Sequence, residues 1–191
     1  MDHDKIEQVA GIHKSELRDT DFLSKCSVRF LCLFYEKVLQ YESTIFFTDE
    51  DLCNEIKGFI FCTTESHEYC SRFLRESSVQ ILLHPSVYLP LLGVIFKRIT
   101  KMLSRNRNRH DYNAEVVYMA VKRQYHRHGV GKKLIKLAED EFLKRKINKY
   151  YLQVFTDNAQ GIAFYKSIGF DVVADIESGN RNKYLMCKST Q

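Results

Sequence analysis

Two glycines stand two positions apart in a strongly basic segment, QYHRHGVGKKLI, which spans Gln124–Ile135. An apolar segment with the composition of a strand precedes it, and a helical pattern of apolar residues follows it. Glycine at such a junction allows the backbone to come close to a ligand, and the N–H groups at the start of a helix attract anions. The segment is therefore typical of a loop that binds phosphate.

Two common phosphate-binding loops do not fit it. A P-loop has the pattern Gly-x-x-x-x-Gly-Lys followed by Ser or Thr, but His126 occupies the first glycine position and Lys133 the last position. The dinucleotide fingerprint has a third glycine where this chain has Leu134, although Asp157 could imitate its ribose-binding acid. A dinucleotide-binding oxidoreductase therefore stays as a remote alternative.

A third kind of loop fits. The residues His126 to Gly131, HRHGVG, resemble the Arg/Gln-x-x-Gly-x-Gly/Ala motif of the GNAT superfamily of acetyl-CoA-dependent N-acetyltransferases. A second segment, NAQGIAFYKSIGF at Asn158–Phe170, resembles the Asn-x-x-Ala-x-x-Phe-Tyr-x-x-x-Gly-Phe motif of the same family. The motifs have the family's order, with a predicted helix and strand between them. The resemblance covers residues 113–188, and the first 60 residues match by element order alone.

The resemblance implies that the chain uses acetyl-CoA as a co-substrate and needs no metal. Gly129 and Gly131 would let successive backbone N–H groups face one concavity, which suits the pyrophosphate of coenzyme A. Basic side chains of the loop, including Lys133, would add charge-assisted contacts. The expected coenzyme-binding residues are Met119, Ala120, Val121, His126, Arg127, His128, Gly129, Val130, Gly131, Lys132 and Asn158.

Two of these assignments concern backbone and capping groups. In the family, the strand before the glycine loop splays from its neighbour and pairs with the pantetheine arm. Met119, Ala120 and Val121 match that strand, and the N–H of Met119 would polarise the thioester carbonyl. Asn158 would cap the short helix that follows it, hydrogen-bond the coenzyme, or do both.

The resemblance also implies two candidate catalytic residues. Tyr165 matches the family tyrosine near the coenzyme sulfur, and a phenol with an ordinary pKa of about 10 stays protonated until it donates to the departing thiolate. Glu115 precedes Gly129 by fourteen residues, the spacing at which histone-type members have a glutamate that acts as a base through water. A carboxylate among apolar residues has a raised pKa. The structural alternatives are a packed helix aromatic for Tyr165 and an exposed strand end for Glu115.

The predicted activity is transfer of acetyl from acetyl-CoA to a primary amine by direct attack. The alternative from another class is a coenzyme-binding module without turnover, which senses acetyl-CoA or docks a partner. The sequence does not distinguish a small amine or amino sugar from a peptide N-terminus or a lysine as the acceptor. Two positions depart from the family motifs: His126 replaces Arg or Gln, and Gly161 replaces the usual alanine.

The order of elements predicts a single α/β domain (a mixed α+β sheet of the GNAT type) over residues 1–191, with helices on both faces of a central sheet. A capping box of Asp4 and Glu7 is expected to open the first helix. Further helices are expected at 22–40, 130–146 and 159–167, and strands at 44–48, 56–63, 115–121, 150–155, 172–177 and 183–188. The family's short first strand is not visible.

The segment 64–112 is a long helical insertion between the family's third and fourth strands. Two helices are predicted over 66–105, broken near His84-Pro85 because proline cannot continue the first helix. From Leu92 onward apolar residues follow helical spacing and basic residues occupy the remaining surface. We expect this pair to cover the acceptor side of the sheet. Contact of 86–105 with a membrane surface is the weaker alternative, and nothing firmly indicates nucleic acid.

The composition, with 45% hydrophobic and 28% charged residues, is that of an ordinary globular protein. The most apolar stretch, 79–96, contains two prolines and is interrupted by polar residues, so it does not predict a membrane span. The start of the chain lacks the pattern of a secretory signal. Six cysteines lie mostly in apolar runs without a Cys-x-x-Cys pair, which favours reduced thiols and a cytoplasmic location.

Overall fold

The computed structural model describes residues 1–18, 23–82, 113–178 and 181–190. Its centre is a six-stranded mixed sheet with the order β1-β2-β3-β4-β6-β5. All neighbouring strands are antiparallel except β3 and β4, which are parallel. The strands are β1 (Thr44–Glu50), β2 (Ile56–Thr63), β3 (Glu115–Val121), β4 (Lys149–Phe155), β5 (Asp171–Ser178) and β6 (Arg181–Ser189).

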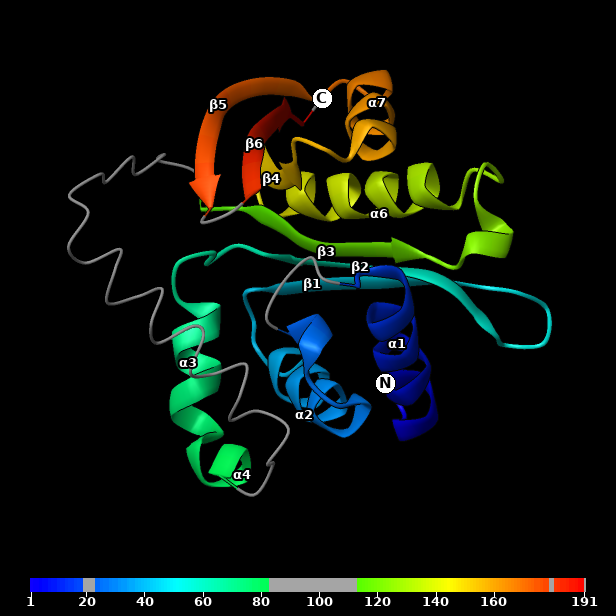
Figure 1. Cartoon of the computed structure of the whole chain (residues 1–191), viewed down its shortest axis with the longest axis vertical. Helices are drawn as coiled ribbons and strands as arrows, with labels where there is room; N and C mark the ends of the chain where they lie inside the picture. Colours follow the sequence, from blue (N-terminus) through cyan, green and yellow to red (C-terminus); the bar gives the residue numbers. More distant parts are fainter. Residues whose placement is uncertain (19–22, 83–112, 179–180, 191) are drawn as a thin grey trace.

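Helices cover both faces of this sheet. Figure 1 shows α1 and α2 below the sheet and α6 and α7 above it. The described helices are α1 (His3–Glu16), α2 (Val28–Val38), α3 (Tyr69–Glu76), α4 (Ser78–Leu82), α6 (Val130–Lys144) and α7 (Ala159–Ser167), with 3-10 turns at Leu23–Lys25 and Arg123–Tyr125. No helix in these ranges is long and apolar enough to cross a membrane.

The two faces of the sheet carry different cores. The strand β2 alternates, so that Phe59 and Phe61 join the cluster under α1 and α2 while Ile60 and Cys62 join the cluster under α6. The first cluster is rich in aromatic rings, among them Phe30, Phe34, Tyr35 and Phe73. The second is largely aliphatic and includes Leu134, Ile135, Ala138 and Leu152. Full burial of one such side chain contributes about 1.5–3 kcal/mol, which fixes the sheet between its helices.

The strands β3 and β4 part soon after they begin. Their parallel register joins Glu115 to Tyr151 and Val116 to Leu152 and then ends, although each strand continues for several residues. On its other edge β3 contains a bulge: Tyr118 pairs with Phe61 and Val116 with Cys62, which leaves Val117 as an extra residue. The divergence leaves a wedge in the middle of the sheet, and the bulge places Val117 and Tyr118 on the same face, towards α1.

Most predicted elements are confirmed, and the strands at 56–63 and 115–121 and the helix at 159–167 have the predicted bounds. The predicted cap of the first helix is wrong. The side chain of Asp2, not of Asp4, accepts a hydrogen bond from the Lys5 N–H at 2.9 Å. The expected helix 22–40 is shorter, because Ser27 accepts from the Phe30 N–H and starts α2 at residue 28.

The predicted break near His84-Pro85 lies outside the described residues, but the helix expected before it is interrupted. It is divided into α3 and α4, because Ser77 takes a non-helical conformation (φ −107°, ψ 14°) between them. Serine is a weak helix former, since its hydroxyl competes for backbone hydrogen bonds. The helix predicted from Leu92, and with it the segment 86–105, lies outside the described residues. The insertion connects β2 and β3, and no strand precedes α1 in the described residues, in agreement with the missing first strand of the family.

Candidate active site

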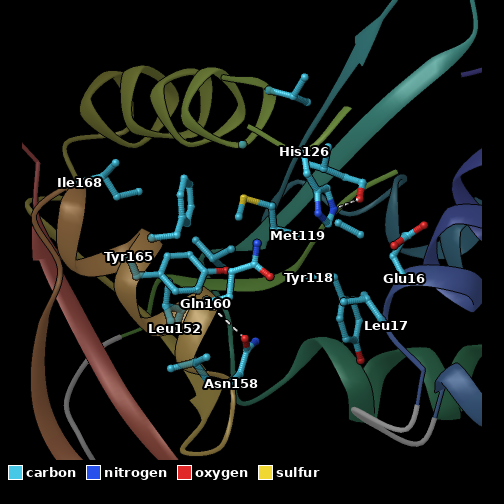
Figure 2. A pocket seen from close by; sticks show the side chains of 18 of the residues that line it. Glu16, Leu17, Tyr118, Met119, His126, Leu152, Asn158, Gln160, Tyr165 and Ile168 are labelled. Carbon is cyan, nitrogen blue, oxygen red and sulfur yellow. Dashed lines mark hydrogen bonds between the residues drawn. The ribbon is translucent and has the colours of Figure 1, made fainter. Parts of the chain in front are cut away.

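A cavity of about 650 Å³ opens where β3 and β4 part, within the usual range for small-molecule sites. One wall is formed by the glycine loop and the helices α6 and α7, and the other by the end of α1 and the bulge of β3 (Figure 2). The α6/α7 wall consists of Tyr125, Arg127, Gly129, Gly131, Asn158, Phe164 and Tyr165. The α1/β3 wall consists of Glu16, Leu17, Val117 and Tyr118.

The glycine loop places a helix N-terminus at the cavity. Gly129 precedes α6 with φ 79°, a left-handed conformation that glycine adopts without cost. Arg127 also has a positive φ of 63°, which is uncommon for a residue with a side chain and turns the chain sharply towards the helix. Because Gly129 has no side chain to cap α6, the first N–H groups of the helix stay available for an anion.

Gly131 is required by close packing. A Cβ atom at this position would lie 3.2 Å from Cζ of Phe164 and 3.9 Å from Cε of Met119. The first distance is shorter than ordinary van der Waals contact, so a larger side chain would have to displace the Phe164 ring of α7. Glycine therefore lets α6 and α7 approach each other closely in this wall of the cavity.

The structure brings most of the predicted coenzyme-binding residues to this cavity. Those that line it are Met119, Ala120, Val121, His126, Arg127, Gly129, Val130, Gly131, Lys132 and Asn158. His128 is exposed and is not part of the lining, because the turn at Arg127 directs the chain past the cavity. The ring of His126 is anchored, since its Nε2–H donates to the Val121 carbonyl at 2.8 Å.

Lys133 has a different partner from the expected phosphate. Its ammonium forms an ion pair with the buried carboxylate of Asp49 in β1, and Lys57 contacts the same carboxylate at 2.9 Å. Burial alone would raise the pKa of Asp49, but the hydrogen bonds from the two lysines hold it below its usual range. This ion pair bridges α6 and the sheet, and the contact of Lys133 with coenzyme stays a prediction.

Asn158 caps α7, as one of its two predicted roles requires. Its Oδ1 accepts a hydrogen bond from the Gly161 N–H at 2.9 Å. Gly161, which departs from the family's alanine, leaves room for this side chain: a Cβ atom there would lie 2.6 Å from the Asn158 amide nitrogen. Both residues line the cavity, so the cap and the cavity share one side chain.

Tyr165 lies in the cavity on α7 (Figure 2). Its ring packs edge-on against Phe170 and Phe164, with ring centroids 5.5 Å and 5.2 Å away. Burial raises the pKa of the Tyr165 phenol well above its ordinary value. The hydroxyl is therefore protonated throughout the physiological range.

Glu115 lies next to the cavity but does not line it. Its half-buried carboxylate accepts a long hydrogen bond of 3.4 Å from the amide of Gln153, which does line the cavity. Burial raises the pKa of Glu115 to about 7, and the charge of Lys183 opposes this shift. The group can therefore take up a proton near neutral pH.

Several residues that line the cavity were not predicted from the sequence. Gln160 and Phe164 lie within the second motif, so the signal for them was present. Glu16 and Leu17 at the end of α1 gave no signal, because only the packing of α1 on β3 brings them to the cavity. Among the described residues, no cluster of His, Cys, Asp or Glu could hold a metal ion.

Comparisons with known proteins agree with this geometry. The Acetyltransferase (GNAT) family matches residues 14–170. Naa20 from Chaetomium thermophilum, solved with a bisubstrate analogue, superposes with a TM-score of 0.63 at 17% identity, covering 100% of this chain and 84% of its own. The PaiA N-acetyltransferase from Thermoplasma acidophilum, solved with coenzyme A, gives 0.60 at 15% identity, with coverage of 99% and 95%.

The ribosomal-protein-S18-alanine N-acetyltransferase from Escherichia coli gives a TM-score of 0.55 at 18% identity and covers 96% of this chain and 87% of its own. No curated protein matched the sequence. At these identities the structural likeness shows the fold, and the family match over most of the chain shows the kinship. The chain is therefore a member of the GNAT acetyltransferase family.

Proposed function

We propose that this protein transfers an acetyl group from acetyl-CoA to a primary amine by direct attack. The observation that carries the proposal is the wedge between β3 and β4, which opens beside an uncapped helix N-terminus and contains a protonated tyrosine. Acetyl-CoA would supply the activated thioester. The protein would bind it, polarise its carbonyl and handle the two protons of the reaction.

The α6/α7 wall suits coenzyme A. The N–H groups at the start of α6 and the side chains of Arg127 and Lys132 favour the pyrophosphate. Beyond Val116 the register with β4 has ended, so the backbone groups on that edge of β3 can bond the amides of the pantetheine arm. The N–H of Met119 would then stabilise the negative charge on the thioester oxygen during attack.

Proton transfer is assigned to two groups. As the amine nitrogen forms its bond to the carbonyl carbon, the carbon–sulfur bond breaks and the thiolate takes a proton from the Tyr165 hydroxyl. The nitrogen loses its surplus proton to Glu115 through a water molecule, because this carboxylate lies behind Gln153. The raised pKa of Glu115, about 7, is well matched to accepting a proton near neutral pH.

A turnover measurement tests the proposal. Purified protein is incubated with acetyl-CoA and a panel of primary amines, and release of free thiol is followed. We expect thiol release that depends on both substrates. A protein that binds acetyl-CoA by calorimetry but releases no thiol with any amine is a coenzyme-binding module, and the proposed reaction is then wrong.

A further inference from the structure

Glu16 is a carboxylate on the cavity wall to which the proposed chemistry gives no role. It is the last residue of α1 and is half-buried. Figure 2 shows it with Leu17 and Tyr118 on the side of the cavity opposite Tyr165, with Met119 between the two sides. It therefore lies on the side from which an acceptor would approach the thioester.

The position of Glu16 is unfavourable for the folded chain. A helix has its negative end at the C-terminus, so a carboxylate in the last turn is repelled by the helix dipole. Two other partly buried carboxylates form ion pairs: Glu50 contacts Lys5 at 2.8 Å and Glu141 contacts Arg145 at 2.9 Å. Within the described part of the chain, no hydrogen bond or ion pair holds Glu16. An unpaired, partly dehydrated anion favours a cation from the ligand.

The surroundings of Glu16 suit an alkylammonium group. Leu17 offers an apolar surface for methylene groups, and the ring of Tyr118 adds an aromatic surface to the same wall. The ring of Tyr118 is held in place by His13, whose centroid lies 4.7 Å away in an edge-on arrangement. His13 in turn hydrogen-bonds the Tyr35 hydroxyl at 2.7 Å in the core. The wall therefore combines a carboxylate, an aliphatic surface and a fixed aromatic ring.

We propose that Glu16 selects acceptors that carry a second cationic group besides the amine that is acetylated. The inference rests on the proposed function for the identity of the reacting amine. The second cation would be an alkylammonium, either from a small diamine or from a lysine side chain in a peptide. Its ion pair with Glu16 would leave the first amine free to reach the thioester.

Binding to the coenzyme A complex tests this without turnover. Calorimetry compares 1,4-diaminobutane with butylamine, which lacks the second charge, in wild type, Glu16→Gln and Glu7→Gln. Glu7 is the matched control, because it lies on the same helix, is exposed and does not line the cavity. We expect the diamine to bind about tenfold more tightly in wild type and in Glu7→Gln, as for a charge-assisted contact at a partly buried site, and about equally in Glu16→Gln.

A parallel pair of peptides, with a free N-terminus followed by lysine or by norleucine, identifies the source of the cation. Whichever pair shows the larger preference that depends on Glu16 is the relevant chemistry, and either result supports the inference. Equal binding of charged and uncharged partners in wild type overturns it. So does a preference that persists in Glu16→Gln, or the absence of binding by all four probes.

Thermal unfolding separates this role from a structural one. Because the charge of Glu16 is unfavourable in the fold, we expect Glu16→Gln to raise the melting temperature by about 1–4 °C. A lower melting temperature with an unchanged diamine preference marks Glu16 as structural and overturns the inference. If the diamine binds through Glu16 but no amine releases thiol, the inference stands and the proposed reaction fails.

Discussion

The α6/α7 wall and the α1/β3 wall enclose the same cavity, but they are built from different parts of the chain. The first comes from two short segments, 125–131 and 158–165, and much of its chemistry lies in backbone groups and glycines. The second joins the end of α1 to a bulge in β3, which are far apart in the sequence, and its chemistry lies in side chains. A backbone site depends on chain geometry, whereas a side-chain site changes with one substitution.

This difference explains why the coenzyme is easier to infer than the acceptor. Backbone N–H groups at a helix start bind phosphate in many unrelated sequences, and the glycines that expose them are visible in the sequence. A carboxylate such as Glu16 acquires its role only through the packing of α1 on the sheet. Substitutions on the first wall should therefore affect binding of the coenzyme, and those on the second should affect the choice of acceptor.

The largest effect is expected when the backbone wall is filled. Gly131→Val places side-chain atoms against Phe164 and in the path of the coenzyme, so acetyl-CoA affinity should fall at least about 100-fold, or by about 2.7 kcal/mol. Gly11→Val is the matched control, because a Cβ atom there meets no atom within 4 Å. Calorimetry with both folded variants checks this. Unchanged affinity in Gly131→Val would remove the loop from the coenzyme site.

The second-largest effect is expected on the chemical step, when the hydroxyl of Tyr165 is removed. Tyr165→Phe removes the proposed proton donor but keeps the ring and its packing, so kcat should fall about 100-fold with little change in KM for acetyl-CoA. Tyr184→Phe, a partly buried tyrosine outside the cavity lining, is the control. Steady-state kinetics with a reactive amine, under conditions in which chemistry limits the rate, measures both. Equal kcat values for Tyr165→Phe and wild type exclude the hydroxyl from the mechanism.

Most residues of the α6/α7 wall could be predicted from the sequence. Ten of the eleven expected coenzyme residues line the cavity, because the motif fixes their order and the loop is short. His128 lies outside the lining, and spacing alone does not reveal the left-handed turn at Arg127 that precedes it. The ion pair of Lys133 with Asp49 was not predicted either, because Asp49 comes from β1 and only the folded sheet brings the two residues together.

The elements were predicted with similar limits. The strand β2 was found with its bounds, because a short and nearly continuous apolar run is typical of a strand buried on both faces. The parting of β3 and β4 was implied by the resemblance, but the extra residue Val117 could not be read from the strand's composition. The contribution of α1 to the cavity was missed altogether, since a helix end has no local signal for what it will face.

The pH profile of activity tests the role of Glu115, which lies next to the cavity. Because burial raises the pKa of Glu115 to about 7, kcat/KM of the wild type should rise as pH increases through about 7 and the carboxylate ionises. In Glu115→Gln the rate at pH 8 should fall about tenfold, and the dependence near pH 7 should disappear. A rise through pH 7 that persists in Glu115→Gln assigns the titration to another group.

Glu115→Gln should lower activity but increase the stability of the fold. A carboxyl whose folded pKa is raised from 4.5 to about 7 is more easily ionised when unfolded, so the folded state loses stability as pH rises between these values. Glu115→Gln should therefore be more stable than wild type at pH 8, by about 1–3 kcal/mol, and equal to it at pH 4. Chemical denaturation at the two pH values measures this, with the exposed Glu177→Gln as control.

The smallest effect is expected for Gly161→Ala. This variant adds one methyl group and tests whether the Asn158 side chain does more than cap α7. An alanine Cβ would collide with the Asn158 amide, whose nitrogen is 2.6 Å away, and would displace the cap. Losing the cap costs about 1 kcal/mol, while alanine in place of glycine in a helix gains about as much, so the free energy of unfolding should hardly change.

If Asn158 also bonds the coenzyme, the acetyl-CoA Kd of Gly161→Ala should rise about threefold to tenfold, because one hydrogen bond is lost. If the cap is its only role, the Kd should stay at the wild-type value. Asn158→Ser, which keeps a cap but shortens the side chain, should weaken acetyl-CoA to the same extent in the first case and leave it unchanged in the second.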